Sequence, residues 1–360
     1  MTAPADDQTT LAYNSPTSQW IVTEKNGTQH IFNNAGYLVS IIDLNGNTIT
    51  INVDATNQNR IASVTDASGR VLTFNYANAS YPRLCTSISD SVGTFSSYTY
   101  DYSTGRLTQV FYPDGSQFNF QYNDSHSNTL ISSVVDSLSK VVEAHTYDSQ
   151  RRGLTSQQAN DANGNAVNKV MLAYQYLGNS WQNHICDSTL NKCNYINVSN
   201  VAQRHYVVST SGSSAFSCAT CGFQGTASST ISDSGYQLSY KDPNGETTVY
   251  TYDSQGNMLS KALPKGDYFS GPAGNDTWNY TYNSFGQALT VTDPLGTHPG
   301  DPNHTTTYSY DTHGNLQSVT TPSPDGRTTP GSVTQFTYNS NGTLHTITDP
   351  LNHVTTINYC

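Results

Sequence analysis

An aromatic residue followed four positions later by glycine recurs along this 360-residue chain. Copies of one short template predict a repeat protein, in which each unit buries its apolar face against its neighbours. The function is then expected in the surface that the array makes. The five copies are Phe32 with Gly36, Tyr252 with Gly256, Tyr282 with Gly286, Tyr310 with Gly314, and Tyr338 with Gly342.

A second aromatic residue lies two places before the first in the later copies, as in Tyr250 and Tyr252. A spacing of two places both rings on one face of a strand, and leaves small polar residues such as Thr251 on the other face. Each such segment is therefore predicted to be a half-buried β-strand.

Turn residues follow each of these strands. In "YDSQGN", Asp253 can hydrogen-bond its own backbone and Gly256 supplies the positive φ of a tight hairpin. A second kind of turn is predicted at strings such as "DPNG" from Asp242, where proline fixes the first central position. One repeat is thus a strand, a glycine turn, a strand and a proline turn.

The returning strand leaves one question open. Leu316 and Val319 are three positions apart, so strict alternation would place them on opposite faces of the sheet. A β-bulge would return them to one face.

The spacing of the copies fits a two-stranded unit. From Tyr252 through Tyr282, Tyr310 and Tyr338 the steps are 30, 28 and 28 residues. The predicted fold is all-β, a long, twisted and curved sheet of about 9 to 14 tandem hairpins.

The strings "YTYDSQGNMLSKALP" and "YSYDTHGNLQSVTTP" resemble the YD repeats, also called RHS repeats, of bacterial secreted and cell-surface proteins and of the related animal teneurins. The resemblance divides the chain into an N-terminal segment (1–27), degenerate repeats (28–176), an irregular Cys-containing insertion (177–235) and well-formed repeats (236–360). The array stops in mid-pattern at the C-terminus, so we expect a piece of a longer protein.

This resemblance implies a sheet that spirals into part of a hollow shell, and it implies export. Such shells commonly enclose a C-terminal toxin or effector domain, which is the expected partner and is absent here. The family segment that cuts the chain to free that domain has no counterpart in this sequence.

Charge narrows the range of partners. Fifteen Lys and Arg against 26 Asp and Glu give a formal net charge of −11. Nucleic acid is therefore disfavoured as a partner, because no basic stripe is available to neutralise phosphates. No segment approaches the about 18 apolar residues of a membrane-spanning helix. We expect a secreted or cell-surface protein whose export signal is not visible in this sequence.

Four cysteines lie in the insertion: Cys186, Cys193, Cys218 and Cys221. They are weak candidates for a zinc site, because six residues separate the first pair and zinc sites prefer about two to four. A disulfide closing the short loop from Cys186 to Cys193 and free thiols are the alternatives. No other metal site is expected, since calcium-like strings such as "DLNGN" from Asp43 are hairpin turns by their "NG" dipeptide.

No catalytic residue and no cofactor are predicted, because nearly all the aspartates fall at turn positions. The favoured function is a non-enzymatic structural scaffold, part of the β-shell that encapsulates or presents a C-terminal domain. A carbohydrate or cell-surface binding module is the main alternative, and a polysaccharide-active enzyme is a third. Buried rings would favour a wall, whereas an exposed row of three or more rings would favour glycan binding.

Overall fold

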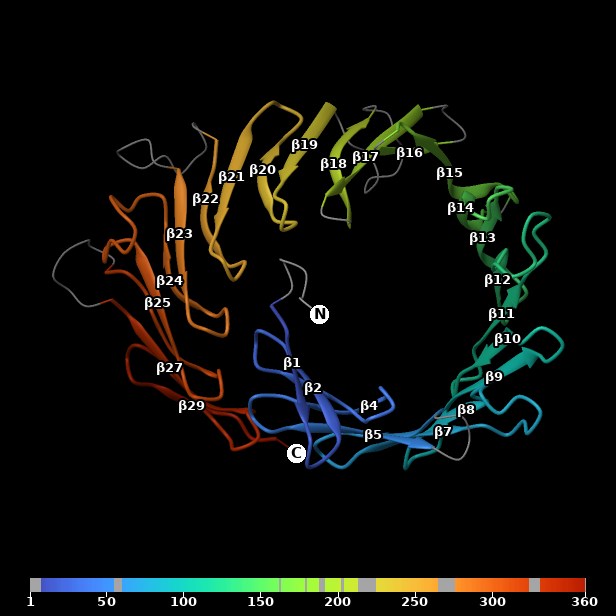
Figure 1. The fold of residues 1–360 in the computed structure, drawn as a ribbon, viewed down its shortest axis with the longest axis horizontal. Helices are drawn as coiled ribbons and strands as arrows, with labels where there is room; N and C mark the ends of the chain where they lie inside the picture. Colours follow the sequence, from blue (N-terminus) through green and yellow to red (C-terminus); the bar gives the residue numbers. More distant parts are fainter. Residues whose placement is uncertain are drawn as a thin grey trace. The chain divides into compact units, whose positions relative to one another are not determined.

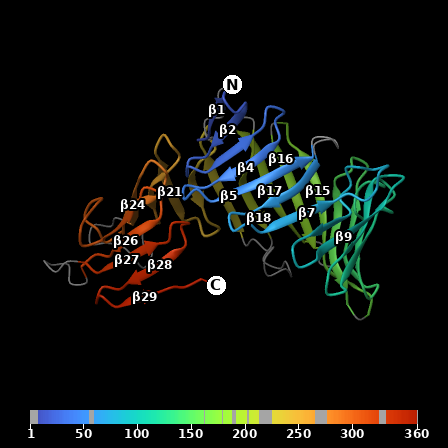
Figure 2. The same ribbon diagram turned by 90° about the horizontal axis from the view of Figure 1, so that it is seen from below.

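The computed structural model describes residues 8–54, 60–161, 163–178, 180–187, 192–201, 204–212, 225–264, 276–323 and 331–359. These residues contain 29 β-strands in one open sheet and no helix (Figure 1). Each strand is paired antiparallel with the next along the chain from β1 to β4 and from β5 to β29, as the last repeats show in Figure 2. The all-β array of hairpins is confirmed.

The chain divides into two compact units, residues 1–48 with 229–360 and residues 49–228. The strands of the first unit are β1 (Thr10–Asn14), β2 (Gln19–Thr23), β3 (Gln29–Phe32), β4 (Leu38–Ile42), β20 (Gln237–Lys241), β21 (Thr247–Tyr252), β22 (Met258–Ala262), β23 (Thr277–Tyr282), β24 (Ala288–Thr292), β25 (Thr305–Tyr310), β26 (Leu316–Thr320), β27 (Val333–Tyr338), β28 (Leu344–Thr348) and β29 (Val354–Thr356).

The remaining strands belong to the second unit, except that β5 and β19 cross the boundary. They are β5 (Thr48–Asp54), β6 (Arg60–Thr65), β7 (Val71–Asn75), β8 (Ser87–Ser89), β9 (Thr94–Asp101), β10 (Arg106–Phe111), β11 (Gln117–Gln121), β12 (Ser133–Asp136), β13 (Val141–Tyr147), β14 (Gly153–Asn160), β15 (Ala166–Tyr176), β16 (Ser180–Asp187), β17 (Lys192–Val201), β18 (Arg204–Gly212) and β19 (Gly225–Ile231).

The glycine turns share one geometry, which Asp253 illustrates. Its backbone N–H donates to the carbonyl of Asn257 (2.9 Å), and its carbonyl accepts from the N–H of Gly256 (3.1 Å). The Asp253 carboxylate also accepts the backbone N–H groups of Gln255 and Asn257 (2.9 and 2.8 Å). This is a three-residue hairpin loop closed by a left-handed glycine, whose φ is +74°.

The proline turns at Asp242 and Asp349 have the same backbone pattern, so for these two the prediction of a second turn type is wrong, whereas Asp293 pairs with His304 across a longer loop. Asp242 pairs with Glu246, and Asp349 pairs with His353, as Asp253 pairs with Asn257. At Asn352 an asparagine replaces the glycine and adopts φ +65°. The aspartate that opens the turn and the left-handed residue three places later therefore set the geometry, and proline is compatible with it.

A β-bulge after each of the five template turns settles the question of the returning strand. Tyr310 lies opposite Leu316, Ser309 lies opposite Ser318, and Gln317 is the extra residue between them. The same shift occurs after the turns of β3–β4, β21–β22, β23–β24 and β27–β28. Leu316 and Val319 therefore share the face of the tyrosines, because directly opposed residues lie on one side of a sheet.

The tyrosine of one repeat also bonds the backbone of the repeat before it. The hydroxyl of Tyr310 donates to the carbonyl of Ala288 (3.0 Å), and Ala288 begins the bulge opposite Tyr282. Equivalent bonds run from Tyr76, Tyr100, Tyr122, Tyr147 and Tyr174 to Ile61, Cys85, Leu107, Ile131 and Gly153. A bulge interrupts the ladder of backbone bonds, and the phenol supplies a replacement donor.

Hydroxyl pairs occupy the opposite face of the sheet. Thr281 bonds Thr290 (2.6 Å) and Thr337 bonds Thr346 (2.6 Å) directly across two neighbouring strands. Cross-strand hydroxyl pairs of this kind stabilise a sheet modestly. The predicted division into an aromatic face and a small polar face is confirmed.

The hydrophobic core is thin. Among the described residues, the buried apolar side chains are Val110 and Ala227, at 7% and 6% exposure, and Pro294, at under 2%. The rings of the five template copies are half-buried. Contacts between adjacent hairpins therefore take the place that a packed second layer has in a sandwich.

The Cys-containing segment differs from the template in strand length. Its described residues continue the sheet as β16 to β19, and β16, β17 and β18 have 8, 10 and 9 residues. The strand just before the segment, β15, is also long, with 11 residues. The returning template strands β22, β24, β26 and β28 have 5 residues each.

Removal of one phenol should expose the contribution of the bond between repeats. We expect Tyr310→Phe to lower the free energy of unfolding by about 1 kcal/mol, because the carbonyl of Ala288 loses its donor. Tyr308→Phe is the matched control, since Tyr308 is two places away on the same face and has no hydroxyl bond to a described residue. Denaturant unfolding of both variants tests this, and equal losses would contradict it.

Alkaline pH should weaken the array. Burial is the main cause that raises the pKa of the tyrosines on the aromatic face of the sheet, and it raises the pKa of Tyr100 to about 12. The other tyrosines whose pKa is raised in this way are Tyr76, Tyr122, Tyr147, Tyr174, Tyr252, Tyr282, Tyr310 and Tyr338. Because the folded pKa exceeds the unfolded value of 10, this stabilisation is complete below pH 10 and is lost as pH rises towards 12. The thermal unfolding midpoint should fall over that pH range, in step with the rise of tyrosinate absorbance. A midpoint that stays constant over the range would refute the expectation.

Candidate functional site

Hairpin turns near the N-terminus contact hairpin turns 230 to 294 residues later within the first unit. We call this contact the seam. Its N-terminal side consists of Lys25, Leu44, Asn45 and Asn47. Its C-terminal side consists of Gln255, Asn257, Gly286, Gly314, Asn315, Asn341 and Gly342.

Lys25 anchors one end of the seam. Its ammonium group donates to the carbonyl of Gln255 (2.6 Å) and to the side-chain oxygen of Asn257 (2.5 Å). Asn257 is 8% exposed, and its own amide donates to Asp253 (2.7 Å). The lysine therefore binds a turn that is already held in shape by its aspartate.

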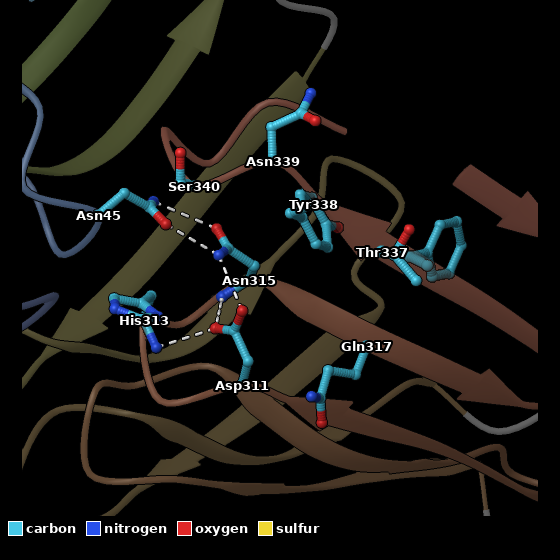
Figure 3. A pocket seen from close by; sticks show the side chains of 10 residues that line it. Asn45, Asp311, His313, Asn315, Gln317, Thr337, Tyr338, Asn339 and Ser340 are labelled. Atoms are coloured by element: carbon cyan, nitrogen blue, oxygen red, sulfur yellow. Dashed lines mark hydrogen bonds between the residues drawn. The ribbon is translucent and has the colours of Figure 1, made fainter. Parts of the chain in front are cut away.

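Two asparagines form the other end of the seam. The amides of Asn45 and Asn315 bond each other reciprocally, at 3.2 and 2.8 Å (Figure 3). Asn47 donates to the carbonyl of Asn341 at 2.9 Å. Turn 43–47 thus contacts two successive turns of the C-terminal repeats.

Glycine permits this close approach. A Cβ atom on Gly342 would lie 2.6 Å from the Asn45 side chain, and one on Gly314 would lie 3.1 Å from Leu44. Both glycines also have positive φ, of +79° and +78°. The same residue therefore closes a hairpin and leaves space for a neighbouring turn.

A polar pocket of about 320 Å³ opens beside the asparagine pair (Figure 3). Asn45 lines it from the N-terminal side, and Asp311, His313, Gln317 and Tyr338 are among the residues that line it from the C-terminal repeats. It lies wholly within the first unit.

The carboxylate in this pocket is occupied by its own turn. Asp311 accepts the backbone N–H groups of His313 and Asn315 (2.9 and 2.8 Å) and the Asn315 amide (2.9 Å). Burial raises the pKa of Asp311, but the hydrogen bonds from Asn315 and His313 outweigh burial and hold that pKa below 3.8. An ionised carboxylate with these bonds orients a turn and suits structure better than proton transfer.

The ten template residues occupy equivalent positions in their five hairpins. The aromatic residues end their strands, and the five glycines have φ between +74° and +84°. Three of the glycines, Gly286, Gly314 and Gly342, also reach the seam.

The structure joins Cys186 and Cys193 in a disulfide between directly opposed positions of β16 and β17, with 3.9 Å between their Cα atoms. These two cysteines are therefore unable to act as thiolate zinc ligands. Cys218, Cys221 and Cys360 lie outside the described residues. Cys85 is a free, half-buried thiol.

Within the described ranges, no three His, Cys, Asp or Glu side chains are grouped so that they could hold a metal ion. The turn at Asp301 is typical of how carboxylates are used here. Backbone N–H groups of Thr297 and Asn303 and the Thr297 hydroxyl lower the pKa of Asp301 to about 2. A search for helices long and apolar enough to cross a membrane found none among the described residues.

Sequence reasoning missed the seam. The turn "DLNGN" carries Asn45 and Asn47 at its third and fifth positions, but asparagine is common at turns for local reasons. Nothing in the chain marks which asparagines bond a turn far away in sequence.

Residues 233–268 match the family model described as RHS Repeat. The match falls where the template, its turn and its bulge are best formed. The chain contains an RHS repeat. A comparison with curated proteins found no match.

Several toxin structures are similar to this chain. "Crystal Structure of TcdB2-TccC3-Cdc42" has 13% identity and a TM-score of 0.40, and the match covers 98% of this chain and 25% of that chain. "Crystal Structure of TcdB2-TccC3" has 13% identity and a TM-score of 0.40, and the match covers 97% of this chain and 26% of that chain. The Photorhabdus luminescens Tc holotoxin pore has 14% identity and a TM-score of 0.37, and the match covers 97% of this chain and 25% of that chain. The chain spans about a quarter of the length of these proteins.

A methyl group placed in the seam should loosen it. We expect Gly342→Ala to cost about 1 kcal/mol more than Gly36→Ala, because its Cβ displaces Asn45 from Asn315. Gly36 is the matched control: it has the same turn role at φ +84°, and a Cβ there would meet nothing within 4 Å.

Amide hydrogen exchange at residues 43–47 measures the local stability of the seam in the two variants. A local measurement is needed because a repeat array need not unfold as one cooperative unit. Exchange that rises equally in both variants would show that backbone strain alone is responsible and that the seam contributes nothing.

Proposed function

We propose that this chain is a non-enzymatic part of the wall of an RHS shell, which encloses or presents a C-terminal effector or toxin domain of a longer protein. The observation that carries this proposal is the seam. Strand pairing alone makes an open strip, whereas the bonds of Lys25, Asn45 and Asn47 fasten its beginning to repeats more than 200 residues later. A wall needs such lateral bonds between turns of the strip.

The composition of the wall supports a structural role. Its aspartates are used by their turns, as Asp253 and Asp311 illustrate, and its tyrosines bond the backbone of the preceding repeat. An active site needs groups that remain free to exchange protons or bind a metal. Incubation with polysaccharides should therefore release no new sugar ends, and release would favour the enzyme alternative.

A secreted or cell-surface location fits the disulfide between Cys186 and Cys193. Disulfides persist in oxidising compartments and are rare in the cytosol. The net charge of −11 agrees with a surface that binds no nucleic acid.

Limited proteolysis of the longer protein that carries this chain tests the enclosure. A C-terminal domain held behind the wall should be cleaved at least about tenfold more slowly than the same domain expressed alone. Asn45→Ala combined with Asn315→Ala should raise the cleavage rate, because it opens the seam. Asn163→Ala, in a turn outside the seam, is the control, and equal cleavage of the enclosed and free domain would contradict the proposal.

A further inference from the structure

The second unit carries exposed aromatic rings where the chain departs from the repeat template. Tyr176 ends β15 and Trp181 lies directly opposite it on β16. Their ring centroids are 4.9 Å apart with planes inclined by 48°, and the residues are 60% and 36% exposed. The template rings are half-buried by contrast, so this pair is free to meet a ligand.

A pocket of about 340 Å³ adjoins Trp181. This volume lies at the lower end of the range of about 300 to 1,000 Å³ that is usual for small-molecule sites. Its lining residues are Arg152, Tyr174, Trp181, Asn183, Val198 and His205.

Strand register places these residues on one face of the sheet. Asn183 is opposite Tyr174, Trp181 is opposite Val198, and Asn200 is opposite His205. Opposed residues share a face, as do residues two apart along one strand. The pocket is therefore a surface feature of β15 to β18 that an incoming molecule can reach from that face.

The walls of the pocket are held in place. The Arg152 guanidinium lies 4.6 Å from the ring centroid of Tyr174 and bonds Asp148 at 2.8 Å. The Tyr174 hydroxyl donates to the carbonyl of Gly153 (3.0 Å). The Cys186–Cys193 disulfide joins β16 to β17 in the register that sets Trp181 opposite Val198. Such fixed side chains lower the entropy cost of binding.

The lining chemistry selects one class of ligand. Trp181, Tyr174 and Val198 offer flat and apolar surface, which the C–H face of a sugar ring can cover. Arg152 donates hydrogen bonds, whereas Asn183 and His205 can both donate and accept them, as neighbouring sugar hydroxyls require. The charge of Arg152 is balanced by Asp148, so nothing in the pocket calls for an anionic ligand.

We propose that this pocket binds a neutral pyranose ring of an oligosaccharide, with the ring stacked on Trp181. The site is additional to the shell function and does not depend on it.

The chain offers a direct optical test, because it contains only three tryptophans: Trp20, Trp181 and Trp278. A Trp20→Phe, Trp278→Phe variant of the full chain leaves Trp181 as the sole emitter. An array of neutral and anionic oligosaccharides should identify neutral binders, and these should change the emission of this variant in a saturable way.

Trp181→Ala should lower the affinity for those binders by about tenfold or more, and Asn183→Ala by about fivefold. Trp20→Ala is a matched control, because Trp20 forms a nearly identical exposed pair with Tyr13, at 4.7 Å and 51°, outside this pocket. Circular dichroism and a retained Cys186–Cys193 disulfide confirm that each variant is folded.

Three results would overturn the proposal. The first is an array with no neutral binder at millimolar ligand, and the second is binding confined to anionic sugars. The third is equal loss of affinity in Trp181→Ala and Trp20→Ala, which would mean that stacking on any exposed tryptophan is enough.

Discussion

The bond from a tyrosine hydroxyl to the backbone of the preceding repeat is the interaction on which the array depends. The strand that returns from each template turn contains a bulge, and a bulge breaks the regular ladder of backbone bonds. The phenol of the next repeat supplies a donor there, as Tyr310 does at Ala288 and Tyr122 does at Leu107. One tyrosine side chain thus provides both a ring that packs on the preceding hairpin and a hydrogen bond that holds the two hairpins together.

This arrangement explains how a sheet with so little core can be ordered. Val110, Ala227 and Pro294 are the buried apolar residues in the part of the chain that the structure describes. Stability must then come from many small terms between adjacent hairpins: ring contacts, hydroxyl pairs such as Thr281 with Thr290, and turns closed by aspartate. Because these terms act between neighbours, repeats can diverge individually while the sheet continues, as it does through β16 to β19.

The seam and the aromatic pocket are two departures from this local rule. The seam bonds turns that are far apart in sequence, and it uses asparagine and glycine that the hairpins already need. The pocket uses long strands and rings left exposed at Tyr176 and Trp181. The seam thus gives turn residues a second contact, whereas the pocket uses positions where the chain departs from the template.

The sequence by itself determined the repeating strand and turn, because alternation of side chains and left-handed glycine are local rules that five copies state repeatedly. For Cys186 and Cys193 it left a short disulfide loop, a zinc site and free thiols as alternatives, and the structure has the disulfide. Only the tertiary structure decided the bulge that places Leu316 with Val319, the partners of the tyrosine hydroxyls, and the pairing of Asn45 with Asn315. Those contacts depend on which hairpins become neighbours, and a residue such as Asn45 looks the same in sequence whether it serves its own turn or one 270 residues away.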